Sequence, residues 1–171
     1  MRIVRSQGVL SDDYNPANRT LALSGDVFGS DSVAAIGVAT HEAGHAIQHA
    51  RHYAPLWARS ALVPTAKIGS SIGYFAMMIG PFMASTNMVL VGAVLFSVVL
   101  LFQVVTLPVE FNASNRAKAL TLEHGIVTPQ ERKGVDAVLN AAALTYVAAA
   151  ISTLLTLLYF LWRSGLIGGR R

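Results

Sequence analysis

The stretch MVLVGAVLFSVVLLFQVVT, residues 88–106, decides the fold. It contains no charged side chain and comes close to the roughly 20 apolar residues that a helix needs to cross a bilayer. Upstream, residues 62–82 are similarly apolar, and Lys67 is the only charged residue between 62 and 106. Pro81 and Asn87 bracket the turn between the two segments. The sequence therefore predicts a transmembrane hairpin over residues 62–106.

A third span is predicted further along the chain. Residues 107–136 are polar, and Thr128-Pro129-Gln130-Glu131 has the pattern of a capping box with proline at the first helical position. We expect the helix that opens there to run to about Trp162, roughly 51 Å at 1.5 Å per residue. The hydrocarbon core is only about 30 Å thick, so the first turns must stand outside it. Residues 137–162 are then the third transmembrane helix.

The composition agrees with a membrane protein. Hydrophobic residues make up 53% of the chain and charged residues 13%, against about 25% charged in a typical globular protein. The formal charge of +4 comes from scattered basic residues without a nucleic-acid motif, so we expect lipid and not nucleic acid as a partner. There is no cysteine, which excludes disulfides and thiolate zinc sites. We expect a single membrane-embedded domain over residues 1–171.

The motif His41-Glu42-Ala43-Gly44-His45 carries the chemistry. It lies in a segment, residues 32–52, that predicts one helix with Ser30 or Asp31 as its N-cap. Positions four apart share a helix face, so His41 and His45 can hold one zinc ion. Glu42 can then act as the base that takes a proton from water, and Gly44 leaves room beside the helix.

Three further histidines are possible ligands. His49 is four residues after His45, but a metal bound by that pair would lack a neighbouring glutamate as base. His52 lies about 16 Å along the axis from His41. His124 stands alone in a polar segment. For His49 and His52 the sequence favours a solvated or packed helix face.

A catalytic zinc usually has three protein ligands, and Glu110 is the best candidate for the third. Downstream of His45 the other glutamates are Glu123 and Glu131, and the capping box occupies Glu131. Glu110 sits among apolar residues at the membrane edge, where a carboxylate without a partner is costly. The alternatives are a salt bridge with Arg116 or a solvated helix start.

Two spans lie between His45 and Glu110, so the chain returns to the side of the membrane from which it started. The two ligands can therefore meet on that side. That side carries all of the 13 Lys and Arg residues except Arg163, Arg170 and Arg171. By the positive-inside rule, the active site is expected to face the cytoplasm, although the three C-terminal arginines then lie outside.

Two segments together with this motif resemble a known family. His41-Glu42-Ala43-Gly44-His45-Ala46-Ile47-Gln48 and Pro108-Val109-Glu110-Phe111-Asn112-Ala113-Ser114-Asn115-Arg116-Ala117 resemble the YugP-like family of neutral zinc metallopeptidases, and residues 140–148 resemble its last span. The likeness extends from about Tyr14 onward. Members of the family generally begin with an additional N-terminal span, so we expect this chain to be a fragment or a short homologue.

The resemblance implies a membrane gluzincin similar in layout to HtpX and the CAAX prenyl proteases. The glutamate of the gluzincin E-x-x-x-D motif maps onto Glu110, and its aspartate, which orients a ligand histidine, maps onto Ser114. A serine offers a weaker, uncharged hydrogen bond, and Asn112 or Asn115 is the alternative for that role. Candidates for stabilising the oxyanion are Arg116, His124 and Tyr14.

The expected fold class is therefore mainly α and membrane-embedded. It has a zincin-like active-site helix, a short edge strand or small sheet, and three transmembrane helices. Residues 1–61 hold the strand and the motif helix, 62–106 the hairpin, 107–136 the third-ligand segment and 137–162 the last span. Thr20-Leu21-Ala22-Leu23 is expected to be the edge strand that binds an extended substrate.

The predicted function is zinc-dependent hydrolysis of peptide bonds at the cytoplasmic membrane face, with one zinc ion and a peptide or membrane-protein substrate. The alternative is an inactive membrane scaffold or adaptor that keeps a metal site. A metal transporter would need ionisable ligands within its spans, and this sequence offers only Lys67, near an end.

Overall fold

The computed structural model describes residues 1–168, so Arg170 and Arg171 lie outside the described residues. The chain divides into two compact units. Unit 1 comprises Met1–Leu56 and Pro108–Thr145, and unit 2 comprises Trp57–Leu107 and the residues from Tyr146 onward. Two long helices, α5 (Thr86–Glu123) and α6 (Arg132–Arg163), each contribute one part to either unit.

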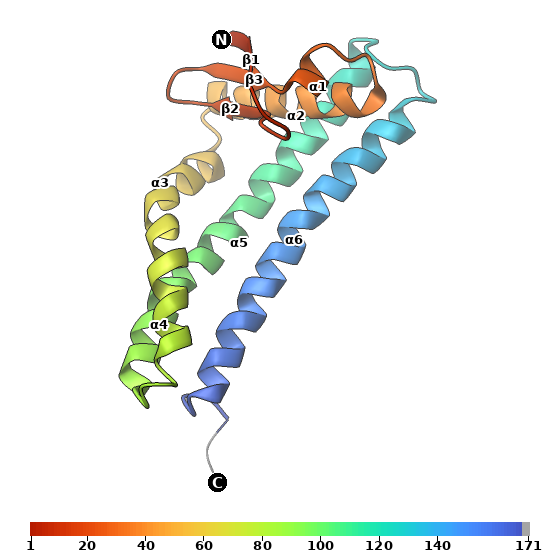
Figure 1. Ribbon diagram of the computed structural model, residues 1–171. Helices are drawn as coiled ribbons and strands as arrows, with labels where there is room; N and C mark the ends of the chain where they lie inside the picture. The colour runs from red at the N-terminus through yellow and green to blue at the C-terminus, as the bar shows by residue number, and fades with distance from the viewer. Residues whose placement is uncertain (169–171) are drawn as a thin grey trace. The chain divides into compact units, whose positions relative to one another are not determined.

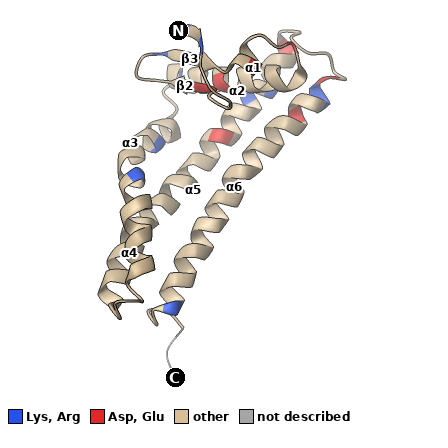
Figure 2. Cartoon of the chain, in the orientation of Figure 1, with Lys and Arg blue, Asp and Glu red and all other residues tan. Residues whose placement is uncertain are grey.

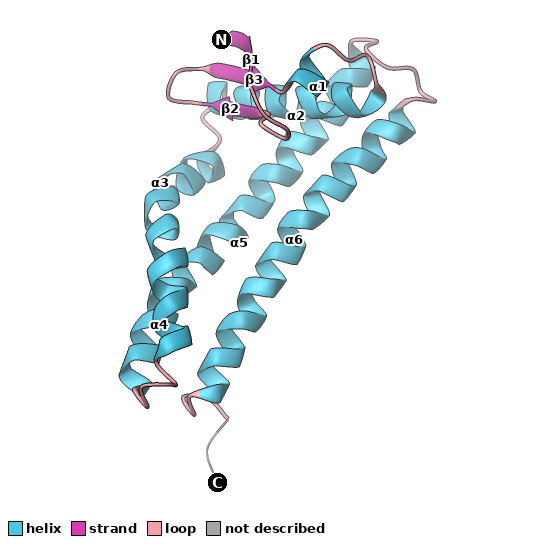
Figure 3. Ribbon diagram, viewed as in Figure 1, coloured by secondary structure: helices cyan, strands magenta, loops and turns pink. Residues whose placement is uncertain are grey.

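Unit 1 contains a small sheet (Figures 1 and 3). Its strands are β1 (Arg2–Arg5), β2 (Asp13–Asn15) and β3 (Thr20–Leu23), in the order β1-β3-β2. β3 pairs parallel with β1 and antiparallel with β2. The expectation of an edge strand at residues 20–23 is therefore wrong, because β3 is bonded on both sides and the free edges belong to β1 and β2.

The sheet packs on helix α2 (Val33–Ala50), which follows the short helix α1 (Gly25–Phe28). The buried side chains of Tyr14, Leu21 and Leu23 contact the small residues Ala39, Ala43 and Ala46 on one face of α2. The N-cap of α2 is Ser32 and not Ser30 or Asp31, since its side chain accepts a hydrogen bond from Ala35 N at 3.2 Å.

Another part of α2 packs against the unit 1 portions of α5 and α6. Val33 and Ile36 contact a buried cluster formed by Ala117, Val127, Val135 and Leu139. Further along α2, the packing is closer still: a Cβ on Gly44 would stand 2.7 Å from the carbonyl oxygen of Ala113. The two helix backbones are therefore nearly in contact at the motif, as the glycine there allows.

Unit 2 is helical and apolar. It holds most of α3 (Ala54–Ile68), a π-helical turn η1 (Gly69–Gly73) and α4 (Tyr74–Ile79), together with residues 86–107 of α5 and 146–163 of α6. Its core consists of Met77, Val89, Ala93, Phe96, Leu157 and Phe160. Large apolar side chains are also exposed on its surface, among them Val91, Val94, Leu101, Val104, Ile151 and Leu155.

Three helices in residues 1–168 are long and apolar enough to cross a membrane: Ala54–Ile79, Thr86–Glu123 and Arg132–Arg163. The number agrees with the prediction, but the helices are longer. The first begins at Ala54 and passes through Pro64. The second continues through Pro108, where the sequence predicted a polar segment from residue 107. Proline is tolerated in membrane helices because neighbouring groups compensate for the lost hydrogen bond.

The hydrogen bonds of the predicted capping box form, but α6 begins at Arg132, so Pro129 precedes the helix and is not its first residue. The Glu131 carboxylate accepts hydrogen bonds from Thr128 N and Oγ1, both at 2.8 Å, and Glu131 N donates to Thr128 Oγ1 at 3.3 Å. These hydrogen bonds lower the pKa of the Glu131 carboxyl. Glu131 is thus engaged at a helix start, as expected, and α6 ends at Arg163, one residue past the predicted end.

Candidate metal centre

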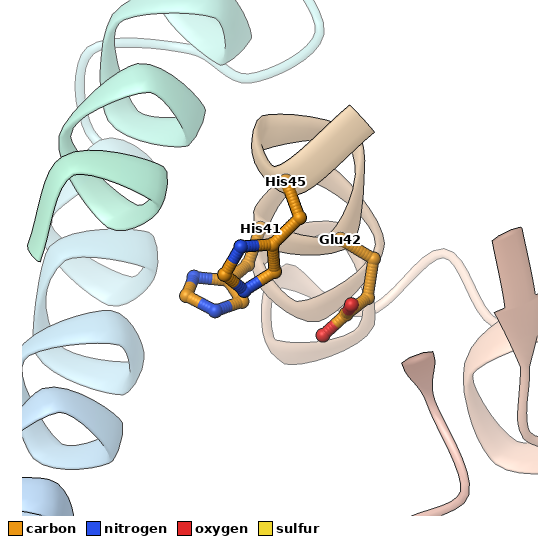
Figure 4. A group of neighbouring side chains, drawn as sticks. All are labelled: His41, Glu42 and His45. Carbon is orange, nitrogen blue, oxygen red and sulfur yellow. The ribbon is translucent and has the colours of Figure 1, made fainter. Parts of the chain in front are cut away.

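The motif histidines lie on one face of α2, one turn apart, and their rings meet edge-on with centroids 4.8 Å apart. Figure 4 shows both imidazoles projecting from the same side of α2, with the Glu42 carboxylate beside them. One potential ligand atom from each of His41, Glu42 and His45 lies within 4.8 Å of the others. His45 is buried, and the other two are partly buried.

Glu110, on α5 within the same unit, points at both rings. Its Oε2 lies 3.1 Å from His41 Nε2 and 3.6 Å from His45 Nε2, and the residue is 1% exposed. Sequence reasoning chose this glutamate, and the structure brings it to the two histidines. The packing of Gly44 on Ala113 makes this meeting possible, because it brings α5 against α2 three residues after Glu110.

The donor set fits zinc. Two imidazole nitrogens and one carboxylate oxygen form a common catalytic zinc set. Tetrahedral ligands at about 2.05 Å from a metal are about 3.3 Å from each other. The observed separations of 3.1 and 3.6 Å lie on either side of that value.

Each histidine has a partner at its other ring nitrogen. Ser114 Oγ lies 3.2 Å from His41 Nδ1, which is where the resemblance placed the group that orients a ligand histidine. Gln48 Oε1 lies 3.0 Å from His45 Nδ1. Sequence reasoning missed Gln48, although it belongs to the quoted motif. A signal was available, since it falls one turn after His45 on the helix.

Electrostatics at the site follow from burial and neighbouring charge. Burial raises the pKa of the Glu42 carboxyl, and the nearby charge of Asp13 on β2 adds to the rise, while His45 and His41 oppose it. For His45, burial alone would lower the pKa, but the Glu110 carboxylate outweighs it, so that the pKa is raised. Asp13 belongs to β2, and β2 packs against α2.

The remaining candidates are spread around unit 1. Arg116 Nε donates to Asn112 Oδ1 at 2.8 Å. Tyr14 is buried, and its hydroxyl lies 2.8 Å from His49 Nδ1, so this pair links β2 to α2. His124 is exposed in the turn after α5, and within residues 1–168 no hydrogen bond joins it to the motif. His52 is exposed, but it lies in the turn after α2, because the helix ends at Ala50 and not at residue 52 as predicted.

A hollow of about 650 Å³ lies at the C-terminal end of α2, against the sheet. Tyr14, Arg19, Ala46, His49 and His52 are among the residues that line it. It adjoins the motif through Ala43, the residue after Glu42. His41, Glu42 and His45 are not among the residues that line the hollow, so it meets the motif only at Ala43.

The described residues thus combine three membrane-compatible helices with a His-His-Glu cluster that lies beside a further glutamate, which is a donor set suited to a metal ion. Comparison with known proteins identifies the family. Residues 1–165 match the family model described as “Putative neutral zinc metallopeptidase”, and the chain belongs to that family. It is 44% identical over 154 residues to the “Putative membrane protease YugP” of Bacillus subtilis (strain 168), covering 90% of this chain and 68% of that protein. No solved structure matches the chain.

Proposed function

We propose that the protein is a membrane endopeptidase of the gluzincin type that hydrolyses peptide bonds at the cytoplasmic membrane face. One zinc ion would be held by His41, His45 and Glu110. The observation that carries the proposal is the convergence of the Glu110 carboxylate on the Nε2 atoms of both histidines, at 3.1 and 3.6 Å. The family membership of the chain supports the zinc-dependent chemistry.

Glu42 is the proposed general base. Zinc, when bound, polarises the scissile carbonyl and makes water a better nucleophile. The Glu42 carboxylate takes the proton from the attacking water and gives it to the departing amine. The position of the carboxyl supports this role, since its oxygen lies within 4.8 Å of a ring nitrogen of each motif histidine.

We propose β2, in place of β3, as the strand that binds the extended substrate. β3 cannot accept another strand, since both of its edges are paired. β2 has a free edge, and Asp13 at its start is close enough to Glu42 to affect the pKa of that carboxyl. A peptide added to β2 would pass the proposed base and reach the hollow lined by Tyr14.

The cytoplasmic orientation rests on charge. Of the 13 Lys and Arg residues, Arg163 is the last residue of the third candidate span, and only Arg170 and Arg171 follow it. Residues 80–85, between the first two candidate spans, contain none. Such an asymmetry is typical of a protein whose basic side faces the cytoplasm.

The test compares the detergent-purified chain with its Glu42→Gln variant on an internally quenched peptide library, with bound zinc measured in parallel. We expect the variant to lose at least about 100-fold in kcat, the lower end of what a general base contributes, while it keeps its zinc. Chelation should abolish wild-type cleavage, and added zinc should restore it. Glu123→Gln, at the exposed end of α5, is the matched control.

Two results would overturn the proposal. The first is wild-type cleavage that survives in Glu42→Gln, since another base would then act. The second is a wild-type protein that binds zinc yet cleaves nothing, which would support the inactive scaffold or adaptor. Ser114 stands where the gluzincin motif has an aspartate, and this difference favours the scaffold or adaptor.

A further inference from the structure

Gln48 is an unusual residue for its position. It lies on α2 one turn after His45, is 0% exposed and is among the largest fully buried side chains of the chain. A buried side-chain amide is costly unless its two N–H groups and its oxygen are hydrogen-bonded. The partners of Gln48 therefore indicate why a polar residue is kept there.

Its amide nitrogen faces α5. Gln48 Nε2 donates to the Val109 carbonyl oxygen at 2.8 Å and to Asn112 Oδ1 at 3.1 Å. The Val109 carbonyl can only accept a hydrogen bond. Asn112 Oδ1 is also fixed as an acceptor, because the Arg116 Nε–H, which can only donate, points at it at 2.8 Å. Both contacts require the nitrogen of the Gln48 amide on this side.

The other end of the amide therefore fixes the tautomer of His45. With the nitrogen committed to α5, the atom at 3.0 Å from His45 Nδ1 is the Gln48 oxygen, which can only accept. His45 Nδ1 must carry a hydrogen. Its Nε2, the atom 3.6 Å from Glu110 Oε2, is then the nitrogen whose lone pair can bind a metal.

The partner of His41 at Nδ1 imposes no such constraint. Its Nδ1 faces the Ser114 hydroxyl at 3.2 Å, and a hydroxyl can donate or accept. Ser114 therefore accommodates either tautomer of His41, whereas Gln48 accommodates only one of His45. Ser114 and Gln48 occupy equivalent positions, but only Gln48 fixes the tautomer of its histidine.

We propose that Gln48 is a positioning residue that presets His45 for zinc binding through Nε2 and couples it to the helical turn that carries Glu110. The coupling is direct, since Val109, which accepts from Gln48, is the residue before Glu110. This inference rests on the proposed function. It assigns to an uncharged amide the task that a carboxylate performs in many zinc sites.

The experiment measures zinc affinity by competition with a chromogenic chelator, on full-length protein in detergent. Gln48→Met keeps the size of the side chain and removes its hydrogen bonds, and we expect zinc affinity to fall about 10- to 100-fold. Gln130→Met, the same substitution at an exposed position in the turn before α6, is the matched control. It changes no contact of the motif histidines, so affinity should stay near the wild-type value. Gln48→Met with wild-type affinity would overturn the proposal.

A second measurement needs no variant. In the zinc-loaded, ¹⁵N-labelled wild type, we expect the His45 ring to show a protected Nδ1–H and a metal-bound Nε2. Ligation through Nδ1 would overturn the proposal even if the variants fail to fold. A failure of the proposed function itself would give other results. The wild type would then bind no zinc, or His45→Ala would bind zinc as tightly as the wild type.

Discussion

At the scale of single residues, the centre combines one carboxylate with two histidines that have neutral partners. Ser114 and Gln48 take the positions where a carboxylate often raises the basicity of a ligand histidine. The spacing of His41, Glu42 and His45, and the scarcity of downstream glutamates, predicted four candidate residues whose side chains the structure brings together. Gln48 was not predicted, because a glutamine near a helix end has the pattern of a solvated face, and only α5 buries it.

The Ser114 hydroxyl should contribute less to metal binding than Gln48. We expect Ser114→Ala to weaken zinc binding by about tenfold, the lower end of the effect of removing a ligand's hydrogen-bond partner, because the hydroxyl does not fix the tautomer of His41. The chelator competition used for Gln48→Met measures both variants side by side. A larger loss for Ser114→Ala than for Gln48→Met would contradict this ranking.

At the scale of secondary-structure elements, α2 and α5 bring the ligands together through backbone contact. The helices themselves could be predicted from apolar segments and caps, and the capping box at Thr128 is confirmed. The place of β3 in the sheet could not be predicted from the sequence. Pairing of β1 with β3 joins segments 18 residues apart in register, and the pattern within a four-residue strand does not indicate its neighbours.

Gly44→Ala tests the contact between α2 and α5. The added Cβ would stand 2.7 Å from the Ala113 carbonyl oxygen and 3.1 Å from its Cα, so the two backbones must move apart. We expect a loss of roughly 1–3 kcal/mol in the free energy of unfolding, as for other overpacked sites, and weaker zinc binding because Glu110 moves away from the histidines. Thermal unfolding and chelator competition measure the two effects.

Gly37→Ala in the same helix is the control. The nearest atom to its Cβ would be Val135 Cγ1 at 3.8 Å, an ordinary contact. Alanine also forms helix better than glycine, by up to about 1 kcal/mol. Gly37→Ala should therefore be neutral or stabilising. Equal destabilisation by the two substitutions would show that close approach at Gly44 is not the cause.

At the scale of the whole molecule, charge is partitioned between the two units (Figure 2). All 9 Asp and Glu residues belong to segments 1–56 and 108–145. Residues 57–107 contain only Arg59 and Lys67 as charged side chains. Composition alone predicted which segments face lipid, and the three candidate spans agree with that prediction.

The absence of cysteine allows the orientation to be tested cleanly. Arg51→Cys introduces an exposed thiol at the end of α2, and Met83→Cys introduces one in the turn before α5. In intact cells, a membrane-impermeant maleimide should label Met83→Cys and should label Arg51→Cys only after permeabilisation. The reverse pattern would refute the cytoplasmic orientation without affecting the metal centre.

The lack of carboxylates in unit 2 bears on whether turnover can be coupled to the proton-motive force. Proton-coupled transport across a bilayer needs acidic or histidine side chains along the route, and residues 57–107 and 146–168 contain none. These residues therefore offer no relay of carboxylates or imidazoles for a proton. Turnover should therefore not depend on the proton-motive force, and proteoliposomes with or without an imposed potential should hydrolyse a soluble peptide at the same rate.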